Sequence, residues 1–221
     1  MSKNSFIDDN KKLRLSKVVE TLKTEYPVLK PALNFSTPFE LLVATILSAQ
    51  CTDARVNIVT KDLFKKYKSP KDYIAVSHEE LAKDIYSTGF YNQKAKSLQK
   101  CCAELVEKYN GKVPADFEKL TKLSGVGRKT ASVVAGNAFG IPSIAVDTHV
   151  IRLTNLLGFV ETKDPKKIEQ KLKELLPEKD WVDITHLLIS HGRKICVARK
   201  PKCFECVVAD YCINKNIRNN K

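Results

Sequence analysis

The chain has 221 residues, of which 38 are Lys or Arg and 25 are Asp or Glu, giving a formal net charge of +13. At roughly 100–200 residues per domain, this length fits one large domain or two small ones. A hydrophobic content of 43% excludes a wholly disordered chain. The positive excess indicates an anionic partner, with nucleic acid favoured over an acidic membrane surface.

No membrane-spanning segment is predicted. The uncharged stretch 131–146 has 16 residues and contains two glycines and a proline, and a bilayer needs about 20 apolar residues. The first residues carry charges where a secretory signal would be apolar. We therefore expect an intracellular, cytoplasmic protein.

Helices are the only elements that the sequence predicts. Residues 37–40 combine an N-cap threonine, a proline at the first helical position and the glutamate of a capping box. Ser77 and Glu80 predict a second capping box. Apolar residues at helical spacing then predict a helix over 92–109, which Asn110-Gly111 should end. Because no sustained alternation of apolar and polar residues occurs, the predicted fold class is all-α.

A glycine turn follows the predicted helical segment 116–122. Gly125 and Gly127 permit positive φ and a close approach of another backbone, and the new helix begins near Arg128. The first N–H groups of a helix form an anion site. A P-loop is excluded because Arg128 stands where its last glycine is needed, and a dinucleotide fingerprint because Thr130 replaces the third glycine.

Two interpretations of this turn remain, a helix–hairpin–helix that grips a DNA phosphate and an ordinary corner between helices. Arg128 and Lys129 beside the glycines favour DNA. The helix N-terminus and Arg128 also disfavour the ammonium form of Lys129, and an uncharged lysine is a nucleophile able to form a Schiff base. An ordinary phosphate contact is the alternative role for Lys129.

Asp147 is an isolated acid after an uncharged run. Its place before Thr148-His149 predicts an N-cap of the next helix. At the edge of a cleft, the same carboxylate could also accept a proton or stabilise a cationic sugar. The two roles are compatible.

Four of the seven cysteines lie near the C-terminus in a C-x6-C-x2-C-x5-C pattern, at Cys196, Cys203, Cys206 and Cys212. In a reducing compartment such a cluster indicates metal ligands, either for tetrahedral zinc or for an iron–sulfur cubane. Zinc ribbons commonly show two C-x2-C knuckles, and only one is present, which favours a cluster. Residues 191–221 also carry eight basic and two acidic side chains. We expect this basic surface to contact phosphates.

Segments 123–131 and 145–149 together resemble the endonuclease III family of helix–hairpin–helix DNA glycosylases. The resemblance covers nearly the whole chain, including 35–42 and 47–53. It implies that Lys129 is the nucleophile and Asp147 the essential carboxylate. It also implies that the four clustered cysteines hold a 4Fe–4S cluster.

The same resemblance assigns DNA contacts. Gln50 should fill the space that an everted nucleotide leaves, and Phe90 should wedge against the opposite strand. Their alternative roles are a polar residue at a helix end and a core aromatic. Contacts with the DNA backbone are predicted for two groups of residues: Gly125, Gly127 and Arg128 of the hairpin, and Arg193 and Lys200 near the cysteines.

Two helical lobes with an active site in the cleft between them are implied. One is a helical barrel of about residues 31–140, with the hairpin at 116–136. The other combines 1–30 with 141–221 and holds the cluster loop 196–212. The expected function is a bifunctional DNA glycosylase and apurinic/apyrimidinic lyase that removes oxidised pyrimidines. Its partner is double-stranded DNA with a damaged or abasic nucleotide, and the protein is expected to be a monomer.

Two alternatives stay open at this point. An adenine DNA glycosylase shares the hairpin, aspartate and cluster, but lacks a lysine at the place of Lys129. A non-catalytic DNA-binding module would use the hairpin and metal loop for grip alone. Lys129 argues against the adenine glycosylase, and the joint presence of Lys129 and Asp147 argues against the non-catalytic module.

Overall fold

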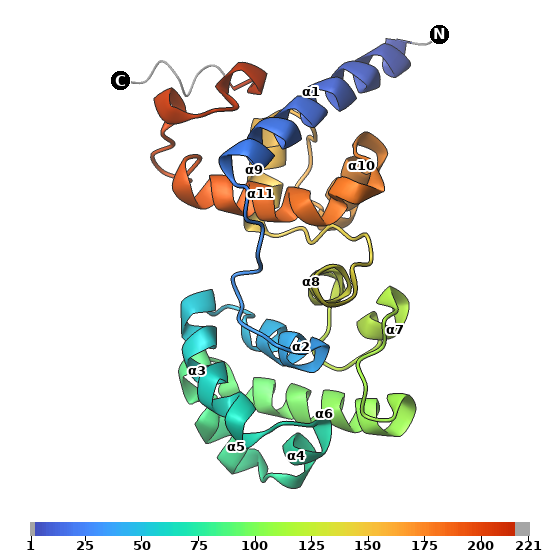
Figure 1. Ribbon diagram of the computed structural model, residues 1–221, viewed down its shortest axis with the longest axis vertical. Helices are drawn as coiled ribbons and strands as arrows, with labels where there is room; N and C mark the ends of the chain where they lie inside the picture. Colours follow the sequence, from blue (N-terminus) through green and yellow to red (C-terminus); the bar gives the residue numbers. More distant parts are fainter. Residues whose placement is uncertain (1–2, 215–221) are drawn as a thin grey trace. The chain divides into compact units, whose positions relative to one another are not determined.

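The structure, a computed structural model, describes residues 3–214, with side chains from Asp9 onward. Every regular element in that range is a helix (Figure 1), which confirms the predicted all-α class. Contacts divide the chain into two compact units, Pro31–Ile141 and the residues on either side of it. Each unit has its own hydrophobic core. None of the described helices is long and apolar enough to cross a membrane.

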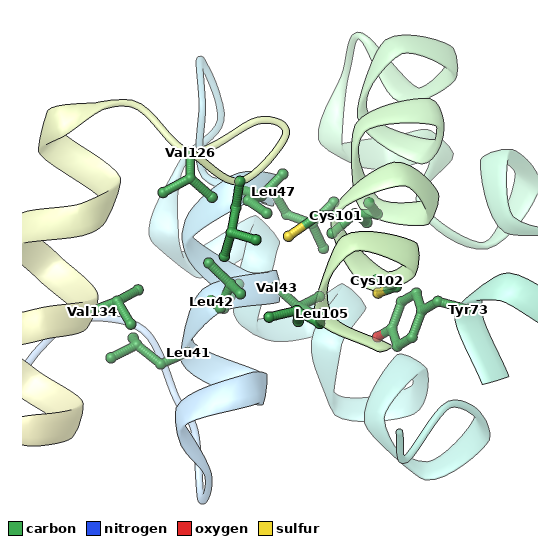
Figure 2. Packing of buried hydrophobic residues seen from close by; sticks show 14 of the residues in the cluster. Leu41, Leu42, Val43, Leu47, Tyr73, Cys101, Cys102, Leu105, Val126 and Val134 are labelled. Carbon is green, nitrogen blue, oxygen red and sulfur yellow. The ribbon is translucent and has the colours of Figure 1, made fainter. Parts of the chain in front are cut away.

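The unit Pro31–Ile141 is built around one apolar helix, α2 (Pro38–Leu47), whose residues from Leu41 to Leu47 are all buried. It packs against α3, α6 and α8, and Figure 2 shows Leu42 and Leu47 among residues of the surrounding elements. The other elements of this unit are α3 (Asp53–Lys66), α4 (Pro70–Ala75), α5 (His78–Asp84), η1 (Tyr86–Thr88), α6 (Tyr91–Tyr109), α7 (Phe117–Thr121) and α8 (Arg128–Phe139).

In each of the two predicted capping boxes, only one of the two expected hydrogen bonds forms. The Thr37 hydroxyl accepts the Glu40 N–H at 3.1 Å, but the Glu40 carboxylate accepts the N–H of the residue before the cap. Ser77 likewise accepts the Glu80 N–H at 3.2 Å, whereas the Glu80 carboxylate pairs with Lys66 Nζ at 2.6 Å. The helices start where predicted. Each glutamate, however, binds a different donor than the box requires.

The second unit contains both ends of the described chain. Its elements are α1 (Lys3–Glu25), α9 (Thr148–Leu156), α10 (Pro165–Leu175), η2 (Glu178–Asp180), α11 (Trp181–Lys194), η3 (Cys203–Glu205) and η4 (Ala209–Tyr211). Helix α1 contacts α10, α11 and η4. Three residues counted in the basic C-terminal segment, Lys215, Arg218 and Lys221, lie outside the described residues.

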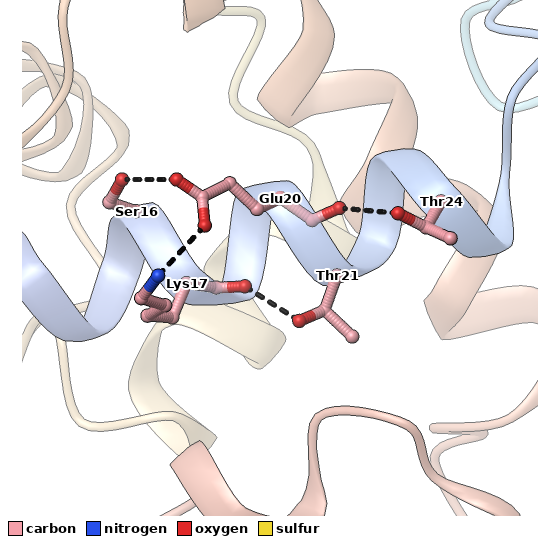
Figure 3. A network of polar contacts seen from close by, with 5 residues as sticks. All are labelled: Ser16, Lys17, Glu20, Thr21 and Thr24. Atoms are coloured by element: carbon pink, nitrogen blue, oxygen red, sulfur yellow. Dashed lines mark hydrogen bonds and ion pairs between the residues drawn. The ribbon is translucent and has the colours of Figure 1, made fainter.

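Helix α1 has one apolar and one polar face. Leu15, Val18, Val19 and Leu22, which recur at helical spacing, are buried in the core of the unit. Figure 3 shows polar contacts along the helix, where Lys17 Nζ pairs with the Glu20 carboxylate at 3.2 Å. Exposed pairs of this kind contribute only about 0.5 kcal/mol, so burial of the apolar face holds α1 in place.

Arg14 joins α1 to η4 and to the turn that follows α9. Its guanidinium donates to the carbonyls of Leu157 and Gly158, and to that of Tyr211 at 2.7 Å. It also lies over the Phe159 ring, 4.4 Å from the ring centre. A charged donor with several carbonyl acceptors is strongly held, so α1, η4 and the turn after α9 form one assembly.

Candidate functional site

The glycine turn between α7 and α8 is held by packing and by one carboxylate. Gly125 has φ +77°, and a Cβ at this position would lie 3.1 Å from the Ser97 Cβ on α6. The Glu104 carboxylate, also on α6, accepts the Ser124 N–H at 2.7 Å and the Ser124 hydroxyl at 2.8 Å. The turn is therefore fixed against α6 before any ligand binds.

Helix α8 begins at the end of this turn. Gly127 is its N-cap, no side chain caps the helix, and no acidic residue lies in its first turn. A Cβ on Gly127 would meet nothing within 4 Å, so the approach to the helix start is open. Arg128 stacks over the Phe117 ring of α7 at 4.9 Å, and Lys129 is exposed next to it. The result is a cationic, accessible anion site.

Asp147 caps α9, as the sequence predicts. Its Oδ1 accepts the Val150 N–H at 2.9 Å, and its side chain is half-buried. The residues that precede Asp147, 143–146, are buried, and the Ala145 N–H donates to Thr185 Oγ1 of α11 at 3.1 Å. The carboxylate is therefore fixed in direction, with Oδ2 left for a further partner. Lys129 belongs to the other unit.

Gln50 and Phe90 share an unusual backbone conformation. Both are non-glycine residues with positive φ, 53° and 49° respectively. Both are exposed, and Phe90 shows 65% of its surface. An exposed aromatic side chain on a left-handed residue is not a core residue, which excludes the alternative role considered for Phe90. Such positions are commonly kept for function.

The four clustered cysteines line one cavity of about 40 Å³, together with apolar residues of α9 and the loop, among them Leu153, Leu156, Leu157 and Val208. The cysteines are all free thiols. Among the described side chains, no three His, Cys, Asp or Glu residues gather closely enough for a single ion. The four cysteines line one shared space, and this donor set fits a multi-iron cluster with one thiolate on each iron.

A second layer of side chains surrounds these cysteines. Arg152 Nη1 donates to the Cys196 carbonyl at 2.6 Å and lies 3.7 Å from its sulfur. His191 Nε2 lies 3.4 Å from Cys206 Sγ, and the Tyr26 hydroxyl is 3.2 Å from His191 Nδ1. Hydrogen bonds from outer residues tune and orient metal ligands.

Burial acts against ionisation of these thiols. It raises the pKa of Cys196 and of Cys206, whereas Arg152 lowers that of Cys196. Burial and Arg152 together lower the pKa of His191 to about 4, so this imidazole is neutral at pH 7. Iron binds the thiolate, and the positive metal offsets the cost of burial. The donor set therefore fits a resident iron–sulfur group.

Arg193 and Lys200, the predicted phosphate contacts of this region, are both exposed. Arg193 lies at the end of α11, and Lys200 lies in the segment between Cys196 and η3. Neighbouring Lys194 instead lies 5.1 Å above the Tyr26 ring. The structure thus presents both predicted residues to solvent.

Sequence reasoning did not find the second layer. Arg152, His191 and Tyr26 were not singled out, because nothing in their local patterns marks them as partners of the cysteines. A weak signal existed for Arg152, a charged residue flanked by Ile151 and Leu153 in an otherwise apolar turn.

Comparison with known proteins gives concordant results. Residues 43–178 match the HhH-GPD superfamily of base excision DNA repair proteins, and residues 196–212 match the iron–sulfur binding domain of endonuclease III. The chain is 50% identical to endonuclease III of Bacillus subtilis, over 89% of this chain and 90% of that protein. It is 44% identical to endonuclease III of Escherichia coli, over 92% and 96%.

Solved structures agree. A trapped endonuclease III–DNA covalent intermediate is similar with a TM-score of 0.89 and 47% identity, over 94% of this chain and 98% of that one. A thermostable thymine-DNA glycosylase has a TM-score of 0.83 and 26% identity, over the same shares. The chain belongs to the endonuclease III family of HhH-GPD base excision repair proteins, the DNA glycosylases and lyases that act on oxidised pyrimidines with a 4Fe–4S cofactor.

Proposed function

We propose that Lys129 and Asp147 carry out the chemistry on an everted nucleotide in duplex DNA. The Lys129 amine attacks C1′, the bond from C1′ to the base breaks, and the base leaves with the electron pair and takes up a proton. The C1′–O4′ bond of the sugar ring then opens, O4′ takes up a proton, and the resulting protonated Schiff base joins Nζ to C1′. Loss of a proton from C2′ then breaks the C3′–O bond, which nicks the strand on the 3′ side.

Asp147 assists by accepting the proton of the attacking amine or by stabilising positive charge on the sugar. Its Oδ1 is used as a helix cap, so Oδ2 is the oxygen proposed for this role. The bond to the Val150 N–H orients the Asp147 carboxylate before DNA binds, and such pre-orientation favours reaction.

The observation that carries this proposal is the placement of Lys129. It is exposed at the start of α8, directly after a turn whose backbone is already fixed. A relative was trapped as a covalent endonuclease III–DNA intermediate. The same chemistry in this chain requires an accessible amine beside a phosphate-gripping turn, and Lys129 meets that requirement.

Gly125, Gly127 and Arg128 are proposed to hold the DNA backbone through the hairpin, with Arg193 and Lys200 adding contacts near the cysteines. Gln50 would fill the gap left by the everted nucleotide, and Phe90 would press on the opposite strand. We propose that the partner is duplex DNA with a damaged or abasic site, that the protein acts as a monomer, and that it works on chromosomal DNA in the cytoplasm.

Cys196, Cys203, Cys206 and Cys212 are the proposed ligands of the 4Fe–4S cluster. Such a cluster can exchange an electron. The proposed role here is structural, because closing residues 196–212 around the cluster presents Arg199, Lys200 and Lys202 to phosphates. A brown protein whose colour is lost when one of these cysteines is replaced would support the assignment.

Borohydride trapping tests the chemistry. The wild-type protein, incubated with a duplex containing an abasic site, should become covalently attached when borohydride reduces the Schiff base. Lys129→Ala should reduce trapping at least a thousandfold, since the nucleophile is gone. Lys83→Ala, an exposed lysine on α5 in the same unit, is the control and should trap like wild type. Undiminished trapping by Lys129→Ala would refute the proposal.

A further inference from the structure

Lys94 is a buried lysine whose amine binds only backbone. It lies in the first turns of α6, and 6% of its surface is exposed. Its Nζ donates to the Leu47 carbonyl at 2.8 Å and to the Thr88 carbonyl at 2.8 Å. Its backbone N–H donates to the Phe90 carbonyl at 3.0 Å. Burying a lysine without a carboxylate partner is costly, so its retention needs a reason.

The two carbonyls lie at the bases of two particular segments. Leu47 is the last residue of α2, and the turn that follows it carries Gln50. Thr88 is the last residue of η1, and the turn that follows it carries Phe90. These are the two residues proposed to enter the DNA duplex. Lys94 therefore joins the anchor points of both segments through one nitrogen.

Both segments contain strained backbone. Gln50 and Phe90 have positive φ, a conformation that persists only where the surroundings hold it. Helix α2 ends at Leu47 with carbonyls that lack intrahelical partners, and Lys94 satisfies one of them. Removing the amine would therefore loosen both turns together.

We propose that Lys94 is a positioning residue, which fixes the turn of Gln50 relative to the turn of Phe90 so that both side chains enter the duplex at one lesion. The inference rests on the proposed roles of Gln50 and Phe90. Lys94 is not a second nucleophile, because its nitrogen is buried and bound to two carbonyls.

The protonation state of Lys94 does not decide this role. Burial lowers the pKa of its ammonium, and the nearby Cys51 thiol acts in the opposite direction. A neutral amine retains two N–H donors, which suffice for the two carbonyls.

The test compares two substrates. Lys94→Met keeps the stem length and removes the donors. On a duplex with an abasic site, we expect kcat/KM to fall about 10- to 100-fold, the range expected when two hydrogen bonds are lost. A single-stranded abasic oligonucleotide has no opposite strand for Gln50 and Phe90 to act on. Borohydride trapping of this substrate should therefore stay within about twofold of wild type.

Two controls separate positioning from general damage. Cys102→Ala removes a buried side chain from the same helix, away from both turns, and should affect the two substrates equally. Hydrogen exchange in Lys94→Met should rise at residues 48–51 and 89–90 and stay unchanged in the 123–131 turn. If Lys94→Met does not fold, Lys94→Gln, which keeps an NH₂ donor group on a shorter stem, is assayed for the same duplex-selective loss.

A double-mutant cycle identifies the route of the effect. In a Gln50→Ala/Phe90→Ala background, Lys94→Met should cause little further loss, because the residues it positions are absent. Equal losses on both substrates, or full additivity in this cycle, would overturn the inference. Failure of the proposed function looks different, since wild-type protein would then trap neither substrate, or Gln50→Ala/Phe90→Ala would act on duplex like wild type.

Discussion

The hairpin (123–131) and the cysteine loop (196–212) both present basic residues that are proposed to contact DNA, but different interactions hold the two segments in place. The hairpin is anchored in a hydrophobic core. Leu123 is only 4% exposed and Val126 only 5%, and both belong to the cluster around α2. The cysteine loop has little of this support. Phe204 is 85% exposed and Val207 is 43% exposed, while only Val208 is inserted deeply.

The difference shows two ways to obtain the same kind of surface. The hairpin needs only protein packing, so its phosphate site exists as soon as the turn lies against α6 and α8 packs against α2. The loop consists of short 3-10 turns, η3 and η4, around a cavity that the four cysteines line. There the free energy of binding a metal group becomes free energy of folding. One surface is intrinsic, and the other depends on the cofactor.

Removing the cluster should give the largest effect on this comparison. Cys206→Ser should lose the visible absorbance and disorder residues 196–212, which removes the phosphate contacts proposed for Arg199, Lys200 and Lys202. The slope of log affinity against log salt should then fall in magnitude by about 3. DNA binding titrated from low to high salt measures it.

Cys101→Ala is the control for cluster loss, because Cys101 is buried in the core around α2. It should keep both the absorbance and the salt slope. A Cys206→Ser protein with an unchanged salt slope would show that the loop holds its basic surface without the cluster.

Substitutions at two glycines of the hairpin, Gly125 and Gly127, should have effects of intermediate size. Gly125→Ala places a Cβ at positive φ and 3.1 Å from Ser97, so the free energy of unfolding should fall by about 1–3 kcal/mol. Gly127→Ala meets nothing within 4 Å and should cost less than about 1 kcal/mol, while weakening DNA binding at the helix start. Denaturant unfolding and DNA titration on both variants measure this. Equal stability losses would contradict the described turn.

Single basic residues should give the smallest effects. Arg128→Ala and Lys200→Ala are each expected to lower the salt slope by about 1. In a Cys206→Ser background, Lys200→Ala should add nothing, whereas Arg128→Ala should keep its full effect. Salt titrations of the single and double variants measure this, and an undiminished Lys200→Ala effect there would erase the distinction between the two surfaces.

Local signals predicted much of the fold. Helix α6 runs over Tyr91–Tyr109, one residue longer than predicted, and Asn110 ends it at φ 53°. Asp147 caps α9 as predicted. These features depend on residues within one turn of each other, which a sequence displays directly.

Long-range contacts could not be predicted in this way. Lys94 binds a carbonyl 47 residues away, Arg152 one 44 residues away, and Tyr26 meets His191 across 165 residues. Each contact depends on how helices pack, and a lone Lys or Arg in an amphipathic helix looks like any solvated charge. The residues that support the two candidate sites from outside can therefore be identified only from the structure.

The contacts of Arg14 have a consequence for how the protein is made. As the chain leaves the ribosome, Pro31–Ile141 can complete its core once residue 141 has emerged. Helix α1, although synthesised first, must wait for α10, α11 and the carbonyl of Tyr211. Its apolar face therefore stays uncovered through nearly the whole of translation. The first helix made is the last to be seated, together with the loop that receives the iron.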